Sequence, residues 1–353
     1  MSLRKGLGLF LFLTLGVSAL IVMTSIDKNA VYILRHAQKI FIVYILGLVF
    51  LAWSCDALRF CMTAKAMGHS IPFVRGLVLT WLHYFGCALT PMQVGGGPFQ
   101  VYVLYKSGIP IGSGIAITLI RTLFSTFLLS IAAPAAFFLR PELVKGHFLV
   151  KGVFFYVGAL SIVMWSAFIV SVVKPQLIKN FLARSLLFLK KFKCLRNLKV
   201  HFIYRRICSE IDSYSENVRH MVGPGFKYFL CAAVLSVFHL LSLFSVLPML
   251  IRAVGMAVDY FLAILAQGVF MFILYFVPTP GASGVAEGGG AAVFSLLVPW
   301  NIAGIMTVLW RFFTEYLAIF MGCIVAIRLI GWGTAEKIIS GEHEAGKDEE
   351  CGA

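Results

Sequence analysis

The apolar stretch at residues 259–298 is interrupted by proline and glycine, in the sequence PTPGASGVAEGGG at residues 278–290. A second apolar stretch, residues 76–105, is interrupted in the same way by TPMQVGGGP at residues 90–98. Proline lacks a backbone donor and clashes with the preceding helical turn, while glycine favours non-helical backbone. Both stretches are therefore predicted to be broken helices.

The rest of the chain has the composition of a membrane protein. Of its 353 residues, 60% are hydrophobic and 13% are charged, whereas about a quarter of residues are charged in soluble domains. This composition excludes a soluble globular protein. A helix rises about 1.5 Å per residue through about 30 Å of hydrocarbon, so a span needs roughly 20 apolar residues. Segments of that length lie at about residues 7–25, 40–60, 113–139, 152–173, 228–251 and 303–327.

The two broken stretches are too short to cross the bilayer twice. In residues 76–105 the two parts reach roughly 22 and 14 Å at helical rise, less than the hydrocarbon thickness. This stretch is predicted to be a re-entrant hairpin that returns to the side it entered. In residues 259–298 the parts reach about 28 and 18 Å. We predict a second hairpin there, and a full crossing by its first part is the alternative.

With two re-entrant hairpins, most lysines and arginines outside the spans fall on the face that holds both termini. The positive-inside rule makes that face cytoplasmic. Each half then has two spans, a hairpin and a third span, so the second half is inverted. An arginine within a predicted span follows each break at a similar distance, Arg121 after Pro91 and Arg311 after Pro280. The predicted fold is an all-α polytopic membrane protein with about six full spans and two re-entrant broken-helix hairpins, arranged as an inverted repeat.

The predicted organisation has two repeats and a tail. Residues 1–140 form the first repeat and residues 152–330 the second. The connection at residues 174–227 is rich in lysine and arginine and is predicted to form an amphipathic helix on anionic lipid headgroups; a solvated linker helix is the alternative. Residues 331–353 form an acidic tail that is predicted to be disordered. The chain has no nucleic-acid-binding motif, so nucleic acid is excluded as a partner.

Irregular backbone at membrane depth must be buried in protein or face a water-filled cavity, because lipid cannot bond its polar groups. Glycine admits a close ligand, and the short helix after each glycine run offers free N–H groups to an anion such as phosphate. Tight packing of small residues is the alternative interpretation. The substrate-binding residues predicted at the two breaks are Gln93, Gly95, Gly96, Gly97, Gln100, Gly281, Ser283 and Gly284. For the two glutamines, bonding of exposed backbone is the alternative.

Charged residues within membrane spans are costly and are expected to face the protein interior or water. Glu315 follows Arg311 by four residues, which allows an ion pair on one helical face. Arg121 is followed after four residues by Ser125 and not by a carboxylate, so its charge needs a partner elsewhere. We predict that Arg121 and Arg311 bind a ligand phosphate. Glu287 is also predicted at the binding site, where it pairs with an arginine, caps a short helix or carries a proton.

Other polar residues in the spans are predicted to be structural. Asp56 and Arg59 lie three residues apart and are predicted to pair with each other, as intramembrane charge partners together with Glu315. His83 and His239 are interpreted as core histidines. The eight cysteines form no CxxC pair, and we expect no metal site, no disulfide framework and no cofactor. The sequence contains no HExxH, P-loop or GxSxG motif, so we do not expect an enzyme.

The two breaks carry a resemblance to a known family. The sequence PTPGASGVAE at residues 278–287, together with TP at residues 90–91 and GGGPFQ at residues 95–100, resembles the flippase-like transmembrane region of bacterial lysyl-phosphatidylglycerol synthases. The resemblance implies translocation of a phospholipid, in the synthases an aminoacylated phosphatidylglycerol, with residues 95–100 and 281–287 as the functional segments. We expect a stand-alone member without the synthase domain, which receives its lipid from a separate lipid-modifying enzyme or moves a different lipid.

The sequence therefore predicts a phospholipid flippase that moves an anionic or aminoacylated phospholipid between leaflets of the bacterial inner membrane, with cytoplasmic termini. Two alternatives stay open at this point. One is a secondary transporter of a small water-soluble anion, and the other is a non-transporting membrane scaffold. The lipid carried, the energy source and the assembly into a homo-oligomer are also left open by the sequence.

Overall fold

The computed structural model describes residues 36–139 apart from residue 94, residues 223–331, residues 12 and 16–20, and scattered positions between 158 and 221. All secondary structure within these residues is helical. The helices are α3 (Ile40–Ala66), α4 (Phe73–Leu89), α5 (Gly96–Lys106), α6 (Ile111–Leu139), α10 (Phe226–Phe244), α11 (Val246–Ala253), α12 (Tyr260–Leu274), α13 (Val285–Phe294), α14 (Trp300–Arg311) and α15 (Leu317–Val325).

Four helical segments among the described residues are long and apolar enough to cross a membrane: Ile40–Ala66, Ile111–Ile131, Phe226–Ala253 and Trp300–Leu329. They coincide with the spans predicted at residues 40–60, 113–139, 228–251 and 303–327. The protein is therefore a multi-pass membrane protein, and the part of the chain that the structure describes is all-helical. Most residues of the spans predicted at 7–25 and 152–173, most of the connection at 174–227 and nearly all of the tail lie outside the described residues.

Both predicted breaks are present. Helix α4 ends before the short turn η1 (Pro91–Gln93), in which Met92 and Gln93 have a φ of 55°. Helix α12 ends before the turn η4 (Pro280–Ala282), in which Gly281 has a φ of 58° and Ala282 a φ of 54°. These left-handed conformations interrupt the helical hydrogen-bond ladder. Proline at the start of each turn and glycine in the second made these interruptions predictable.

The glycines at the two breaks lie only partly where the sequence predicted them. Gly96 and Gly97 lie inside α5 rather than before it, whereas Gly281 and Gly284 precede α13 as predicted; Gly288, Gly289 and Gly290 lie inside α13. A Cβ on Gly96 would lie 2.3 Å from Nδ1 of His83, and one on Gly290 would lie 2.5 Å from Cγ2 of Thr307. These two glycines allow neighbouring helices to pack closely, as small residues do in membrane proteins.

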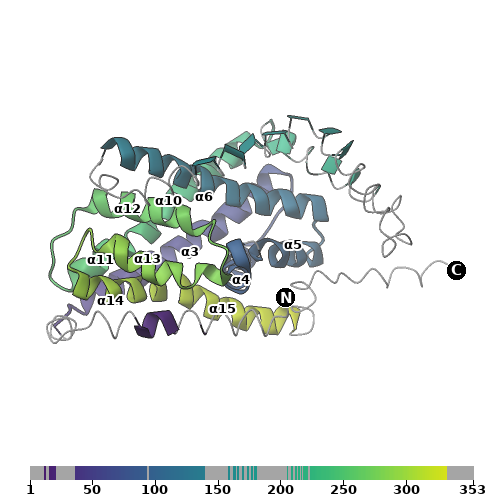
Figure 1. The fold of residues 1–353 in the computed structure, drawn as a ribbon. Helices are drawn as coiled ribbons and strands as arrows, with labels where there is room; N and C mark the ends of the chain where they lie inside the picture. The colour runs from purple at the N-terminus through teal and green to yellow at the C-terminus, as the bar shows by residue number, and fades with distance from the viewer. Residues whose placement is uncertain are drawn as a thin grey trace, which may run out of the picture.

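The two breaks meet within the bundle. The N–H of Met92 donates to the carbonyl of Val277 over 3.2 Å, and turn η4 also contacts α4. The long helices lie side by side, with α4 and α5 toward one end and α11, α13 and α14 toward the other (Figure 1). Helix α3 runs through this arrangement in contact with α4, α6, α10 and α11. Two interrupted segments that are far apart in sequence thus come together inside the helix bundle.

Candidate functional site

A buried group of polar side chains surrounds Asp56 on α3, and we call it the Asp56 cluster (Asp56, Arg59, Thr80, Arg121 and Ser125). Arg121 of α6 donates to Asp56 through both Nε, over 3.0 Å, and Nη2, over 2.6 Å. Arg59, one turn along α3, pairs with Oδ1 of Asp56 and donates to Oγ of Ser125 over 2.8 Å. Thr80 of α4 donates to Oδ2 over 2.9 Å. The cluster therefore joins three helices around one carboxylate.

The pairing of Asp56 with Arg59 agrees with the sequence prediction. The second partner of Asp56 was not predicted, because Arg121 lies 65 residues later in the chain on another helix. Arg121 thus has a protein carboxylate as its partner, and its guanidinium lies 5.0 Å from the centre of the Phe60 ring. Spacing rules detect pairs within one helix and give no information on pairs between helices.

A second group surrounds Arg311, the last residue of α14, and we call it the Glu287 cluster (Gly281, Gly284, Glu287, Arg311, Glu315 and Tyr316). Arg311 donates through Nη1 to Glu287 over 3.0 Å. Its Nη2 donates to Glu315 over 2.7 Å and to the carbonyl of Gly281 over 3.0 Å. The predicted pair with Glu315 is present. A π-helical turn, Phe312–Tyr316, follows Arg311 and holds Glu315; such turns are frequent at functional sites.

Glu287 also caps the start of α13. Its Oε2 accepts the N–H of Gly284 over 2.6 Å, and its Oε1 accepts the hydroxyl of Tyr316 over 3.0 Å. Two of the roles considered for Glu287, pairing with an arginine and capping a short helix, are therefore present together. In the first break, the N–H of Gly95 donates to Oγ1 of Thr90 over 2.7 Å. Both glycine N–H groups are thus bonded to protein groups in this conformation.

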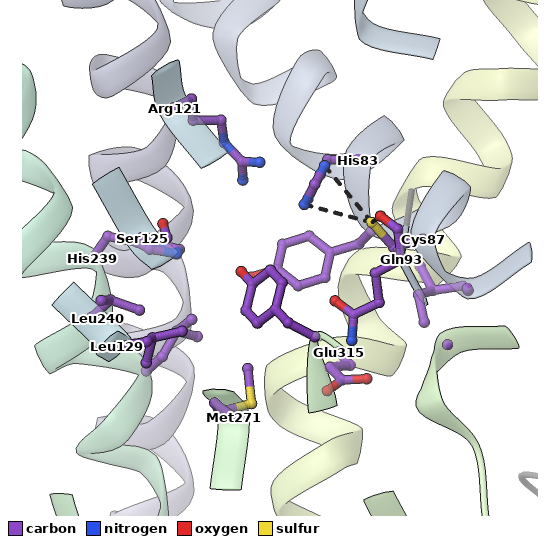
Figure 2. A pocket seen from close by; sticks show the side chains of 16 residues that line it. His83, Cys87, Gln93, Arg121, Ser125, Leu129, His239, Leu240, Met271 and Glu315 are labelled. Atoms are coloured by element: carbon purple, nitrogen blue, oxygen red, sulfur yellow. Dashed lines mark hydrogen bonds between the residues drawn. The ribbon is translucent and has the colours of Figure 1, made fainter. Parts of the chain in front are cut away.

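A cavity lies between the two clusters (Figure 2). Arg121 and Ser125 of the Asp56 cluster line one side, and Glu315 of the Glu287 cluster lies on the opposite side. The volume of the cavity that the centres of water molecules can occupy is about 60 Å³. This volume holds a few water molecules. The other polar side chains of the lining are His83, Tyr84, Cys87, Gln93, His239 and Tyr275. A cavity that carries charged side chains inside an apolar bundle is the setting expected for a transport path.

The predicted binding residues divide into three groups around this cavity. Those that line it are Gln93, Arg121, Gly281 and Glu315. Those bonded directly to a lining residue are Asp56, Arg59 and Arg311; Glu287 is one bond further away, through Arg311. Those outside the lining are Gly95, Gly96, Gly97, Gln100, Ser283 and Gly284. The fully buried Gln100 donates to the carbonyl of Leu79 over 3.0 Å, which is the structural alternative considered for it.

Several lining residues were missed in the sequence. His83 and His239 were interpreted as core histidines; both line the cavity, His239 with a buried side chain and His83 with a half-buried one. His239 bonds the carbonyl of Ala52 through Nδ1 over 2.9 Å. A weak signal was present, because His83 and Cys87, like Arg121 and Ser125, lie four residues apart in otherwise apolar helices. Among the described residues, no group of three or more histidine, cysteine, aspartate or glutamate side chains is placed to hold a metal ion.

The comparison with known proteins agrees with the resemblance found at the two breaks. Residues 8–322 match the family described as the lysylphosphatidylglycerol synthase TM region. The chain is also 22% identical over 314 residues to a UPF0104 membrane protein of Archaeoglobus fulgidus, covering 89% of this chain and 94% of that protein. The family match extends through the two breaks and the two charged clusters. This multi-pass membrane protein therefore belongs to the family of the lysylphosphatidylglycerol synthase TM region.

Proposed function

We propose that the protein is a phospholipid translocase that passes the lipid headgroup through the cavity between the two clusters. One observation carries this proposal: a cavity with a cationic side chain on one wall and an anionic side chain on the other lies where two broken helices meet in an apolar bundle. Desolvation of the headgroup is the main barrier to lipid flipping, since polar groups are costly in hydrocarbon. A path lined by polar side chains lowers that barrier while the acyl chains stay in lipid.

The proposal includes the finer architecture predicted from the sequence. The two broken segments act as re-entrant hairpins from opposite membrane faces, within inverted repeats at residues 1–140 and 152–330. The contact between Met92 and Val277 supports this arrangement, as does the position of α5 and α13 toward different ends of the bundle (Figure 1). Many transporters place their binding site between inverted repeats with discontinuous helices. Both termini are then cytoplasmic, in a bacterial inner membrane.

Passage of a headgroup requires the cavity to widen, because its present volume holds only a few water molecules. The two turns are suited to act as hinges. Met92, Gln93 and Ala282 have a positive φ without being glycine, a conformation that is unfavourable for residues with a side chain. The N–H of Met92 bonds the carbonyl of Val277, three residues before η4, and this bond has to break for the two turns to move apart. The proposed cycle therefore opens the cavity by moving η1 away from η4 and involves no covalent step.

A reconstitution experiment tests this function. The full chain in liposomes is expected to exchange acyl-labelled fluorescent phospholipids between leaflets faster than protein-free vesicles, measured as the label that dithionite reaches from outside. Uptake of radioactive phosphate and sulfate is measured on the same vesicles. Anion uptake without lipid exchange would contradict the proposal in favour of a small-anion transporter. Folded, inserted protein that supports neither process would indicate a membrane scaffold.

A further inference from the structure

The two clusters carry opposite excess charge. In the Asp56 cluster, two guanidinium groups share one carboxylate. In the Glu287 cluster, two carboxylates share one guanidinium. The clusters are almost fully buried, with side-chain exposures of 0% for Asp56, Glu287 and Arg311, so bulk water does little to screen these charges. One wall of the cavity is therefore a net cation, and the facing wall is a net anion.

The excess charge of each cluster lies at the cavity. Arg121 uses Nε and Nη2 for Asp56, and its Nη1 makes no hydrogen bond with the described residues. Glu315 uses Oε2 for Arg311, and its Oε1 makes no hydrogen bond with that part of the chain. Both residues line the cavity from opposite sides (Figure 2). The cavity thus presents an available donor on a cation and an available acceptor on an anion.

We propose that the cavity selects a phospholipid headgroup with one phosphate and one primary ammonium group. This inference rests on the translocase function proposed above. The phosphate oxygen accepts from Nη1 of Arg121, and the ammonium donates to Oε1 of Glu315. Each contact is a charge-assisted hydrogen bond. Tyr84 and Tyr275 also line the cavity and add aromatic faces, which attract ammonium ions.

The same geometry disfavours other headgroups. A headgroup with a phosphate and no amine leaves Glu315 without a partner and brings a second negative charge toward it. A headgroup with a quaternary ammonium has the correct charges, but it lacks the N–H that Glu315 accepts. Phosphatidylethanolamine therefore matches the two walls better than phosphatidylglycerol or phosphatidylcholine.

Leaflet exchange of acyl-labelled lipids with different headgroups tests this selectivity. Native protein is expected to exchange phosphatidylethanolamine about tenfold faster than phosphatidylglycerol, a difference of about 1.4 kcal/mol in barrier. Glu315→Gln keeps an oxygen that accepts from Arg311 and removes the negative excess, so this preference is expected to disappear. Glu315→Asp is expected to restore it in part. Glu216→Gln, at an exposed position, is the matched control and retains the native preference. Equal exchange of the two lipids by native protein would overturn the selectivity and leave translocation intact.

A binding measurement tests the same site without transport. Detergent-purified native protein is heated with glycerophosphoethanolamine, glycerophosphoglycerol or inorganic phosphate, and its melting temperature is recorded. Glycerophosphoethanolamine is expected to raise the melting temperature the most, and Glu315→Gln is expected to remove that advantage. Selective stabilisation without any lipid exchange would support the headgroup site and contradict translocation. Equal stabilisation by all three compounds, or by none, would overturn the headgroup site.

Discussion

Replacing Asp56 by asparagine is expected to remove most of the folded protein. The carboxylate of Asp56 is the partner of Arg59 and Arg121 and accepts from Thr80, and it is fully buried. Breaking a buried ion pair by removing one partner costs about 3–5 kcal/mol, and here two guanidinium groups lose their counter-charge. Since total stabilities are about 5–15 kcal/mol, the variant should show a much lower melting temperature and a low monodisperse yield on size-exclusion chromatography.

Asp259→Asn is the matched control for this substitution. Asp259 caps α12 by accepting the N–H of Leu262 over 3.0 Å, and asparagine caps a helix about as well as aspartate, so this variant should keep a stability close to that of the native protein. The double variant Asp56→Asn with Arg59→Gln leaves one unpaired guanidinium instead of two, and it should recover part of the lost stability. An Asp56→Asn protein as stable as the Asp259→Asn control would show that the Asp56 cluster does not hold α3, α4 and α6 together.

Glu287→Gln is expected to have the next largest effect, a loss of about 3 kcal/mol, at the lower end of the range for a broken buried pair. Arg311 keeps Glu315 as a partner, which limits the loss. The amide cannot accept at both of its ends, so either the N–H of Gly284 or the guanidinium of Arg311 faces an N–H₂ group. A lower melting temperature and faster hydrogen exchange at the first turn of α13 should follow.

Glu315→Gln distinguishes the cap from the ion pair. Glu287 accepts a hydrogen bond from the N–H of Gly284 at the start of α13, whereas Glu315 bonds to Arg311 and does not cap α13. Its amide variant should therefore leave hydrogen exchange at residues 284–288 unchanged. Equal exchange at these residues in the Glu287→Gln and native proteins would contradict the capping role of Glu287.

The helix breaks could be predicted because their causes are local in sequence. Pro91 and Pro280 end the preceding helical pattern, and Gly281 supplies a residue that adopts a positive φ without steric cost. The pair of Arg311 and Glu315 was predictable for the same reason, since four residues place two side chains on one helical face. Each of these features depends on residues within one helical turn or one tight turn.

The composition of the site could not be predicted to the same extent. The pairs Asp56–Arg121 and Glu287–Arg311 join different helices, and a single sequence does not tell how helices are rotated about their axes. In these evenly apolar helices polar residues provide little information on orientation, so the cavity position of His83 and His239 was missed. The roles of the glycines were also hidden, because packing against a neighbour and close approach of a ligand require the same small residue.

Filling the cavity tests most directly whether the headgroup passes through it. Leu240 of α10 lines the cavity with 9% exposure, whereas its neighbour Leu241 is 43% exposed on the outer surface of the bundle. Leu240→Trp is expected to abolish leaflet exchange of phosphatidylethanolamine in liposomes. Leu241→Trp adds the same volume outside the cavity and should exchange lipid at the native rate. Native exchange rates from folded, inserted Leu240→Trp protein would contradict passage through this cavity.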